Sequence, residues 1–210
     1  MATRHPHIAH ADSSALLIVD VQEVFRPYIA GFEAMVAAIN LLARGCLRLD
    51  VPIAISEQYP AGLGETVSEI DNVFHGVSPK PWRFEKLEVS SAAAPAWADA
   101  PPAVASAETI IVVGIETHVC VSQTVLDLIA ADKNATVQVV ADAVGSRDPW
   151  QRSVALERLA REGAVITTAE TVLFELLGVA GTPEFKDIQR LIKAYDAARA
   201  SASVGANERV

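Results

Sequence analysis

The chain has 210 residues, of which 51% are hydrophobic and 20% are charged. A chain of this length and composition buries a large core, which excludes the disordered and fibrous classes. Its 17 Lys and Arg against 26 Asp and Glu give a formal net charge of -9, which disfavours nucleic acid and anionic membranes as partners. We expect a single domain over residues 1–210, with loose tails at 1–13 and 201–210.

Three features bear on where the protein acts. Its apolar runs, such as Ala15–Val19 and Ile110–Val113, are far shorter than the roughly 18 residues of a membrane span. The first residues include Arg4 but no apolar segment of a secretory signal. Two cysteines, Cys46 and Cys120, are too few for a disulfide scaffold. We therefore predict a cytoplasmic protein with no membrane partner.

Strands and helices are predicted to alternate along the chain, which favours an α/β fold with a parallel sheet of about six strands between two layers of helices. In chain order, we expect strands over 15–20, 51–56, 83–89, 109–114, 136–141 and 164–167. We expect helices over 32–46, 121–131, 149–161, 167–178 and 182–200, and a short one within 92–102. Residues 58–81 show no strong period, so this long loop is a candidate wall of a substrate site.

Three reactive side chains stand out: Asp20 ends the first predicted strand, Lys86 lies in the segment after the long loop, and Cys120 follows the fourth strand. In an open parallel sheet, ligands bind beyond the carboxyl ends of the strands, where Asp20, Lys86 and Cys120 are expected. A thiol at the start of a helix feels the positive end of the helix dipole, which lowers its pKa and favours attack on a carbonyl. Taken singly, the cysteine also fits a packing role, the aspartate a cap and the lysine a solvated surface charge.

Three strings, spread along most of the chain, stand out: Ala15–Gln22, Lys86–Ser90 and Val112–Thr124. Together they resemble the isochorismatase-like cysteine hydrolase superfamily. Five further segments look like its isochorismatase-domain-containing branch: Ser56–Gly64, Ala141–Ala143, Ser146–Arg147, Leu173–Leu177 and Phe185–Ile188. The resemblance implies a Rossmann-like, three-layer αβα fold.

The resemblance also implies roles for individual residues. The acid at Asp20 accepts the thiol proton, Lys86 supports the acid and the developing charge, and Cys120 forms a covalent acyl intermediate. It further implies a cis peptide between Ile115 and Glu116, with the N–H groups of Glu116 and Cys120 forming an oxyanion hole. Lys86 is preferred to Lys80 because Ser90 and Ser91 follow it at the distance typical of the family.

The chain also departs from known branches of this superfamily. Nicotinamidases carry an Asp-x-His metal motif after the second strand, where this chain reads Ser56-Glu57-Gln58-Tyr59. No metal and no cofactor is therefore expected. Isochorismatases that act on a vinyl ether lack the nucleophilic cysteine, so the presence of Cys120 disfavours that reaction.

The predicted function is hydrolysis of a small amide, ureide or related C–N acyl compound through a Cys120 thioester. The alternatives are a non-catalytic protein that binds a metabolite or partner on the same scaffold, and a redox-sensing role for Cys120. A small molecule is the expected partner, and the family implies a homo-oligomer, a dimer or higher. Five residues are candidates for lining the substrate pocket: Gln22, Phe25, Tyr59, Trp82 and Thr117.

Overall fold

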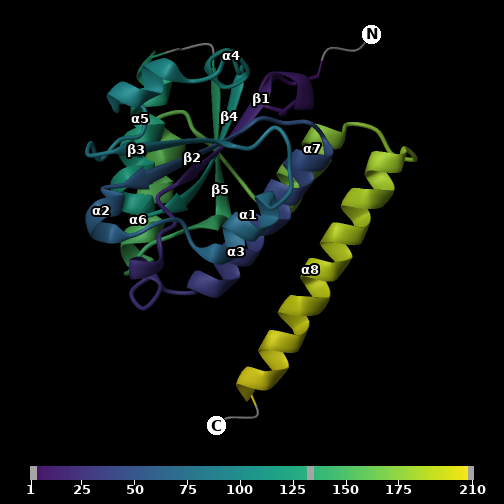
Figure 1. The fold of residues 1–210 in the computed structure, drawn as a ribbon. Helices are drawn as coiled ribbons and strands as arrows, with labels where there is room; N and C mark the ends of the chain where they lie inside the picture. Colours follow the sequence, from purple (N-terminus) through teal and green to yellow (C-terminus); the bar gives the residue numbers. More distant parts are fainter. Residues whose placement is uncertain (1–3, 132–134, 208–210) are drawn as a thin grey trace.

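A computed structural model describes residues 4–131 and 135–207, with side chains through residue 201. One sheet of six parallel strands, in the order β3-β2-β1-β4-β5-β6, forms its centre (Figure 1). The strands are β1 (Ser14–Val19), β2 (Ile53–Gln58), β3 (Trp82–Lys86), β4 (Thr109–Ile115), β5 (Thr136–Gly145) and β6 (Val165–Thr167). The predicted three-layer α/β fold is confirmed.

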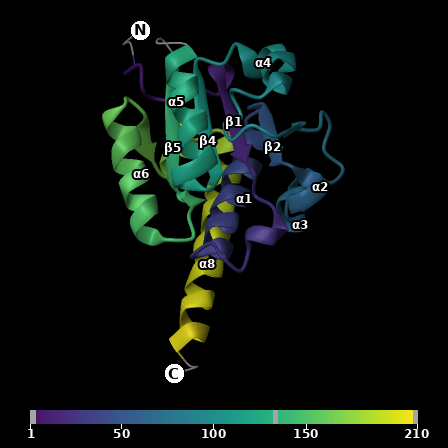
Figure 2. The same cartoon turned by 90° about the vertical axis from the view of Figure 1, so that its left-hand side faces the viewer.

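Helices cover both faces of the sheet (Figures 1 and 2). One face packs against α1 (Phe32–Arg48), α7 (Ala169–Leu177) and α8 (Pro183–Asn207), and the other against α5 (Ser122–Ala131) and α6 (Pro149–Arg161). The three short helices are α2 (Pro60–Leu63), α3 (Ser68–Asp71) and α4 (Pro102–Ala105). Along β1, Leu16 and Ile18 enter the first core, and Leu17 and Val19 enter the second. Because successive side chains alternate, a strand buried on both faces is apolar throughout.

The order of the strands fixes where a ligand site belongs. β1 lies between β2 and β4, and the chain moves outward from it in both directions, so the order reverses there. Ligands in open α/β sheets bind at this switch point, outside the carboxyl ends of the strands. Val19, the last residue of β1, is in register with Ser56 and with Gly114, so the segments after these three strands meet at one edge.

Several boundaries differ from the sequence-based expectation. β3 begins and ends earlier than 83–89, β5 continues to Gly145, and α8 continues to Asn207. The extra length of β5 follows a register shift against β4 between Val112 and Gly114, which a hydrophobic pattern does not reveal. Residues 58–81 form α2, α3 and a short 3-10 turn, and Ile70 and Phe74 from this segment are buried in the core beside α1.

The segment before β1 is also more ordered than the loose tail expected for 1–13. Ala9 is fully buried, and its N–H donates to Glu175 Oε2 on α7 at 2.9 Å. Gln138 on β5 donates to the same carboxylate oxygen at 2.8 Å. A partly buried carboxylate therefore anchors residues preceding β1 to α7 and to the sheet. Residues 1–3 and 208–210 of the two expected tails lie outside the described residues.

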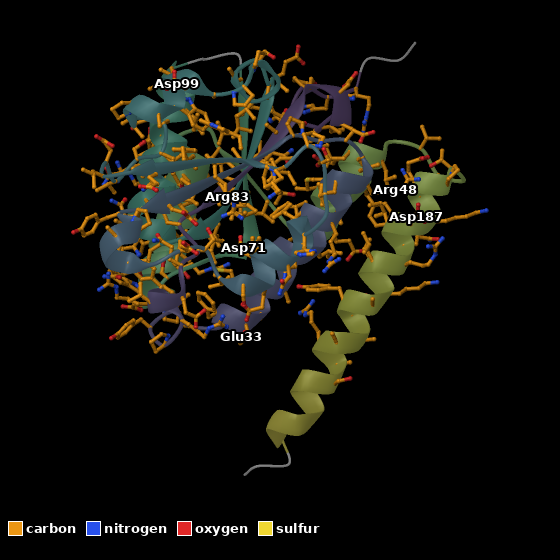
Figure 3. All side chains as sticks on the ribbon, in the orientation of Figure 1. Glu33, Arg48, Asp71, Arg83, Asp99 and Asp187 are labelled. Atoms are coloured by element: carbon orange, nitrogen blue, oxygen red, sulfur yellow. The ribbon has the colours of Figure 1, made fainter. Side chains whose placement is uncertain are left out.

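Helix α8 is held to α1 by charge as well as by apolar contact. Arg48 at the end of α1 pairs with Glu184 at 2.8 Å and with Asp187 at 2.6 Å, and Figure 3 labels Arg48 and Asp187 where the two helices meet. Ile188 and Ile192 of α8 enter the core beside α1. None of the described helices is both long enough and apolar enough to cross a membrane.

Candidate active site

A buried ion pair lies at the carboxyl edge of the sheet. Asp20 directly follows β1 and has a positive φ of 53°, and Lys86 is the last residue of β3. Lys86 Nζ lies 2.7 Å from Asp20 Oδ2, and neither side chain is more than 2% exposed. Lys80, the other candidate lysine, is exposed. The structure therefore brings together the acid and the amine that the sequence places 66 positions apart.

Two buried hydroxyl groups support the carboxylate of Asp20. Ser56 Oγ donates to Asp20 Oδ1 at 2.7 Å, and Ser91 Oγ donates to Ser56 Oγ at 3.0 Å. Burial raises the pKa of Asp20, and the Lys86 ammonium, the Ser56 hydroxyl and the Cys120 thiol act against that rise. Asp20 Oδ2 faces the ammonium and, within the described residues, accepts no well-aligned hydrogen bond. Its contact is the ion pair with Lys86, and the nearby Cys120 thiol also lowers the pKa of this carboxyl.

Lys86 is surrounded by oxygen atoms. Besides Asp20, Nζ contacts Gln58 Oε1 at 2.6 Å and the carbonyl oxygens of Glu88 and Val89 at 3.1 Å each. An ammonium has three N–H donors, so these contacts use its full capacity. Gln58 was not among the residues predicted from the sequence. It lies in the Ser56–Gly64 segment and begins the 58–81 candidate wall, but neither signal assigns a role to its side chain.

Cys120 lies in a π-helical turn, Thr117–Val121, which connects β4 to α5. Its thiol is partly exposed and close enough to Asp20 to influence the pKa of that carboxyl. Burial and the negative charge of Asp20 raise the pKa of Cys120 to about 12, with Lys86 acting in the opposite direction. The expectation of a lowered thiol pKa is therefore wrong. Desolvation beside a carboxylate outweighs the favourable field of the helix start.

The turn that carries Cys120 is fixed to the end of β5. Glu116 follows a cis peptide after Ile115, and its carboxylate accepts hydrogen bonds from the Arg147 side chain, one of them 2.6 Å long. The Thr117 hydroxyl donates to the Gly145 carbonyl at 2.9 Å. Burial raises the pKa of Glu116, but the hydrogen bonds and charge of Arg147 together lower it by more than burial raises it. The net shift is therefore downward. These contacts hold the backbone on which the thiol is mounted.

Two of the predicted pocket residues have structural partners. The amide of Gln22 is buried, donates to the carbonyls of Gln58 at 2.9 Å and Gly64 at 2.5 Å, and accepts from the Gln58 N–H at 3.0 Å. Thr117 is fully buried, with its hydroxyl committed to β5. Both side chains therefore hold loops around the site rather than face an open space.

The other three predicted pocket residues are placed differently. Tyr59 is 51% exposed, and its N–H donates to the Lys86 carbonyl at 2.8 Å, which puts it at the rim of the site. Phe25 is partly buried against the core beside α1. Trp82 begins β3 and stacks on Phe84 at 4.5 Å between ring centroids. Four residues of extended strand, about 13 Å, separate it from Lys86, so the structure does not bring Trp82 to the site.

The second cysteine takes no part in this cluster. Cys46 is fully buried in the core beside α1, whereas Cys120 packs against the core on the opposite face of the sheet. Burial raises the pKa of Cys46 to about 12. Cys46 is therefore not placed to form a disulfide with Cys120. Among the described residues, no three His, Cys, Asp or Glu side chains are arranged to hold a metal ion.

The fold and the cluster of acid, amine and thiol define a doubly wound α/β protein with a nucleophilic candidate site. Residues 14–171 match the family model of the isochorismatase domain. The chain is 39% identical to the secreted isochorismatase effector Isc1 of Phytophthora sojae, over 87% of this chain and 86% of that protein. It is 40% identical to isochorismatase domain-containing protein 1 of Danio rerio, over 86% of this chain and 61% of that protein. The chain belongs to the isochorismatase family.

Solved structures agree with this assignment. The MAR1 ribonuclease of Caenorhabditis elegans superimposes with a TM-score of 0.79 at 34% identity, covering 88% of this chain and 91% of that one. The YcaC gene product of Escherichia coli, described as an octameric hydrolase of unknown specificity, gives a TM-score of 0.75 at 20% identity, covering 96% of this chain and 99% of that one. At that identity, the second match shows the fold alone. The family relatives support a hydrolase function.

Proposed function

We propose that the protein hydrolyses a small amide, ureide or related C–N acyl compound through a thioester on Cys120. The observation that carries this proposal is the convergence of three reactive groups at the switch point of the sheet. A buried carboxylate is paired with an ammonium and influences a partly exposed thiol. A protein that only binds a ligand has no need for all three.

The chemistry follows from the protonation states. Because the pKa of Cys120 is raised to about 12, the resting thiol keeps its proton at neutral pH. As sulfur attacks the carbonyl carbon, Asp20 takes this proton, and the backbone N–H groups of Glu116 and Cys120 receive the negative oxygen. The C–N bond then breaks, and the leaving nitrogen takes the proton from Asp20. Water, deprotonated by Asp20, cleaves the thioester and restores the thiol.

Lys86 has an electrostatic part in this sequence. Its ammonium lowers the pKa of Asp20 against the rise caused by burial and so favours the ionised carboxylate that a base requires. It does so without itself being exposed to bulk water, so the pairing is not screened by salt.

Turnover in a Cys120→Ala variant is the test. Purified protein is incubated with a panel of small amides and ureides, and release of ammonia or amine is measured, with hydroxylamine present in parallel to trap an acyl thioester as a hydroxamate. We expect activity and trapping in the wild type and in a Cys46→Ala control, and neither in Cys120→Ala. Turnover that survives undiminished in Cys120→Ala would remove the proposal. Saturable binding without turnover in the wild type would favour the metabolite-binding alternative.

The net charge bears on the substrate class. A formal charge of -9 repels a polyanion, and affinity for nucleic acid depends mainly on cationic side chains that neutralise phosphates. One solved structure with this fold, from C. elegans, is named a ribonuclease, and that name describes the C. elegans protein. We therefore keep a small molecule as the substrate, and include RNA in the panel as the contrasting case.

Two properties accompany this function. We propose that the protein self-associates, a state that light scattering after size-exclusion chromatography measures directly. The YcaC neighbour is described as octameric. We also propose that it acts in the cytoplasm, because Cys46 and Cys120 are free thiols and a reducing compartment keeps thiols in that state.

A further inference from the structure

The side-chain carbonyl of Gln58 connects two of the three reactive groups. Gln58 is the last residue of β2, and its Oε1 lies 2.6 Å from Lys86 Nζ and 4.0 Å from Cys120 Sγ. The second distance is that of a weak hydrogen bond from a thiol. One neutral acceptor therefore contacts both the ammonium and the nucleophile.

The orientation of this amide is determined by its neighbours. Gln58 Nε2 donates to the Leu87 carbonyl at 2.9 Å, an atom that only accepts, while Oε1 faces an ammonium that only donates. Rotating the amide by half a turn would place an NH₂ group against the ammonium and an oxygen against a carbonyl. The carbonyl is therefore committed to Lys86 and Cys120.

The backbone of Gln58 is fixed as well. The buried amide of Gln22 accepts from the Gln58 N–H at 3.0 Å and donates to its carbonyl at 2.9 Å. The pairing of Gln58 with Lys86 in the β2–β3 register adds a second restraint. A buried amide therefore holds the residue that contacts the reactive groups.

We propose that Gln58 is a positioning residue, which holds the Lys86 ammonium beside Asp20 and orients the resting Cys120 thiol through its side-chain carbonyl. This inference rests on the proposed function, because it assigns Gln58 a part in presenting the nucleophile. Gln58 occupies one N–H of Lys86 and offers the thiol proton an acceptor. When the carbonyl is absent, that N–H is free to turn toward sulfur.

Two substitutions make opposite predictions. Gln58→Glu adds a negative charge within 4.0 Å of Cys120 Sγ, which disfavours the thiolate. Gln58→Met keeps the length of the side chain and removes the carbonyl, which frees an N–H of Lys86 to stabilise the thiolate. We expect alkylation of Cys120 to become roughly tenfold slower in Gln58→Glu and roughly threefold faster in Gln58→Met. The pH at which a given alkylation rate is reached should be higher in the first variant and lower in the second.

The experiment measures the rate of Cys120 alkylation by iodoacetamide between pH 6 and 10, read from the mass of the peptide that contains residue 120. Gln123→Glu is the matched control, because it adds the same charge at an exposed position on α5, three residues from the thiol. Its profile should coincide with that of the wild type. If the substitutions only loosened the segment around Gln58, the alkylation rate of Cys120 would change in the same direction in both Gln58 variants.

Opposite shifts in the two Gln58 variants, with Gln123→Glu unchanged, support the inference. Shifts of the same sign, unchanged profiles, or an equal effect of Gln123→Glu overturn it. Because the readout is labelling and not turnover, these results are separate from the Cys120→Ala test. The proposed function fails if Cys120→Ala retains turnover, which the labelling experiment does not measure.

Discussion

Lys86 Nζ and Asp20 Oδ2 lie 2.7 Å apart, with side chains 0% and 2% exposed. Burying two charges is costly, and their attraction offsets that cost only when both partners are present. The pair is therefore a liability to stability if either member is removed. Its presence at the switch point of the sheet fits a function that needs an ionised acid in a dry site.

Removing the ammonium alone should destabilise the fold strongly. Lys86→Met leaves the carboxylate of Asp20 buried without its counter-ion, so we expect the free energy of unfolding at pH 7 to fall by about 3–5 kcal/mol. The double variant Asp20→Asn/Lys86→Met should recover a large part of this loss, because no unpaired charge is then buried. Urea unfolding followed by circular dichroism measures all three proteins. Lys80→Met, at an exposed position, should change the free energy by less than about 0.5 kcal/mol.

The sequence predicts the reactive groups because each lies at or after the end of an expected strand or in the segment after the long loop. Asp20, Lys86 and Cys120 come at or near the ends of β1, β3 and β4, and the carboxyl ends of parallel strands share one edge. The motifs around them add the family. The alternation of strands and helices also predicts the three layers, since that pattern depends on local periodicity alone.

Interactions between distant residues could not be predicted in this way. Gln58 contacts Lys86 and Cys120 across sequence separations of 28 and 62, and no spacing rule specifies such contacts. The direction of the pKa shift at Cys120 depends on the balance of burial, Asp20 and Lys86, which exists only in three dimensions. The position of Trp82 is a simpler case, because β3 begins there and ends at Lys86, a distance from the site that the predicted bounds 83–89 do not give.

Because Asp20 raises the pKa of Cys120, we expect Asp20→Asn to make the thiol more reactive while hydrolysis is lost. The charge of Asp20 is one of the causes of that rise, and its removal leaves the ammonium of Lys86 to favour the thiolate. Alkylation of Cys120 by iodoacetamide at pH 8 should therefore become roughly tenfold faster or more, since a nearby charge shifts a pKa by about 1–3 units. Hydrolysis should be lost in the same variant, because the base is gone. Peptide mass spectrometry measures the first effect, and amine release measures the second.

Asp127→Asn is the control for this pair of measurements. Asp127 is exposed on α5, the helix that follows Cys120, so its neutralisation should change neither rate. Alkylation of Asp20→Asn at or below the wild-type rate would contradict the assigned coupling between carboxylate and thiol.

The pairing of Glu116 with Arg147 predicts a stability effect that depends on pH. Because the pKa of Glu116 is lower in the folded protein than its ordinary value of 4.5, its pairing stabilises the fold above that pH and loses this effect as the pH falls through the folded pKa. Arg147→Ala should therefore lower the free energy of unfolding by about 1–2 kcal/mol at pH 7, because it removes the side-chain donors of a buried carboxylate and leaves only the backbone N–H of residue 147. The difference from the wild type should shrink toward zero in urea melts at progressively lower pH.

Arg161→Ala separates this effect from the loss of a surface charge. Arg161 pairs with Glu157 on α6, and both side chains are more than 60% exposed. Exposed ion pairs contribute little, so we expect a change below about 0.5 kcal/mol at either pH. An equal loss in both variants would mean that Glu116 has no special dependence on Arg147.

Gly114 is the position where the site depends most directly on the absence of a side chain. It has a positive φ of 115°, and a Cβ there would collide with the backbone carbonyl oxygen of Val19 on the neighbouring strand. The carbonyl oxygen of Val19 belongs to the backbone and cannot move aside as a flexible side chain would. β1 and β4 would therefore have to separate next to Asp20 and the turn that carries Cys120. Gly114→Ala should cost about 3 kcal/mol or more in the free energy of unfolding. Gly31→Ala is the matched control, because Gly31 has a φ of 70° but open space around its Cβ position. We expect Gly31→Ala to lower the free energy of unfolding by only about 1 kcal/mol, because only the backbone conformation is unfavourable there. Urea melts measure both variants. Equal losses would show that close packing of β1 against β4 is not what requires glycine at position 114.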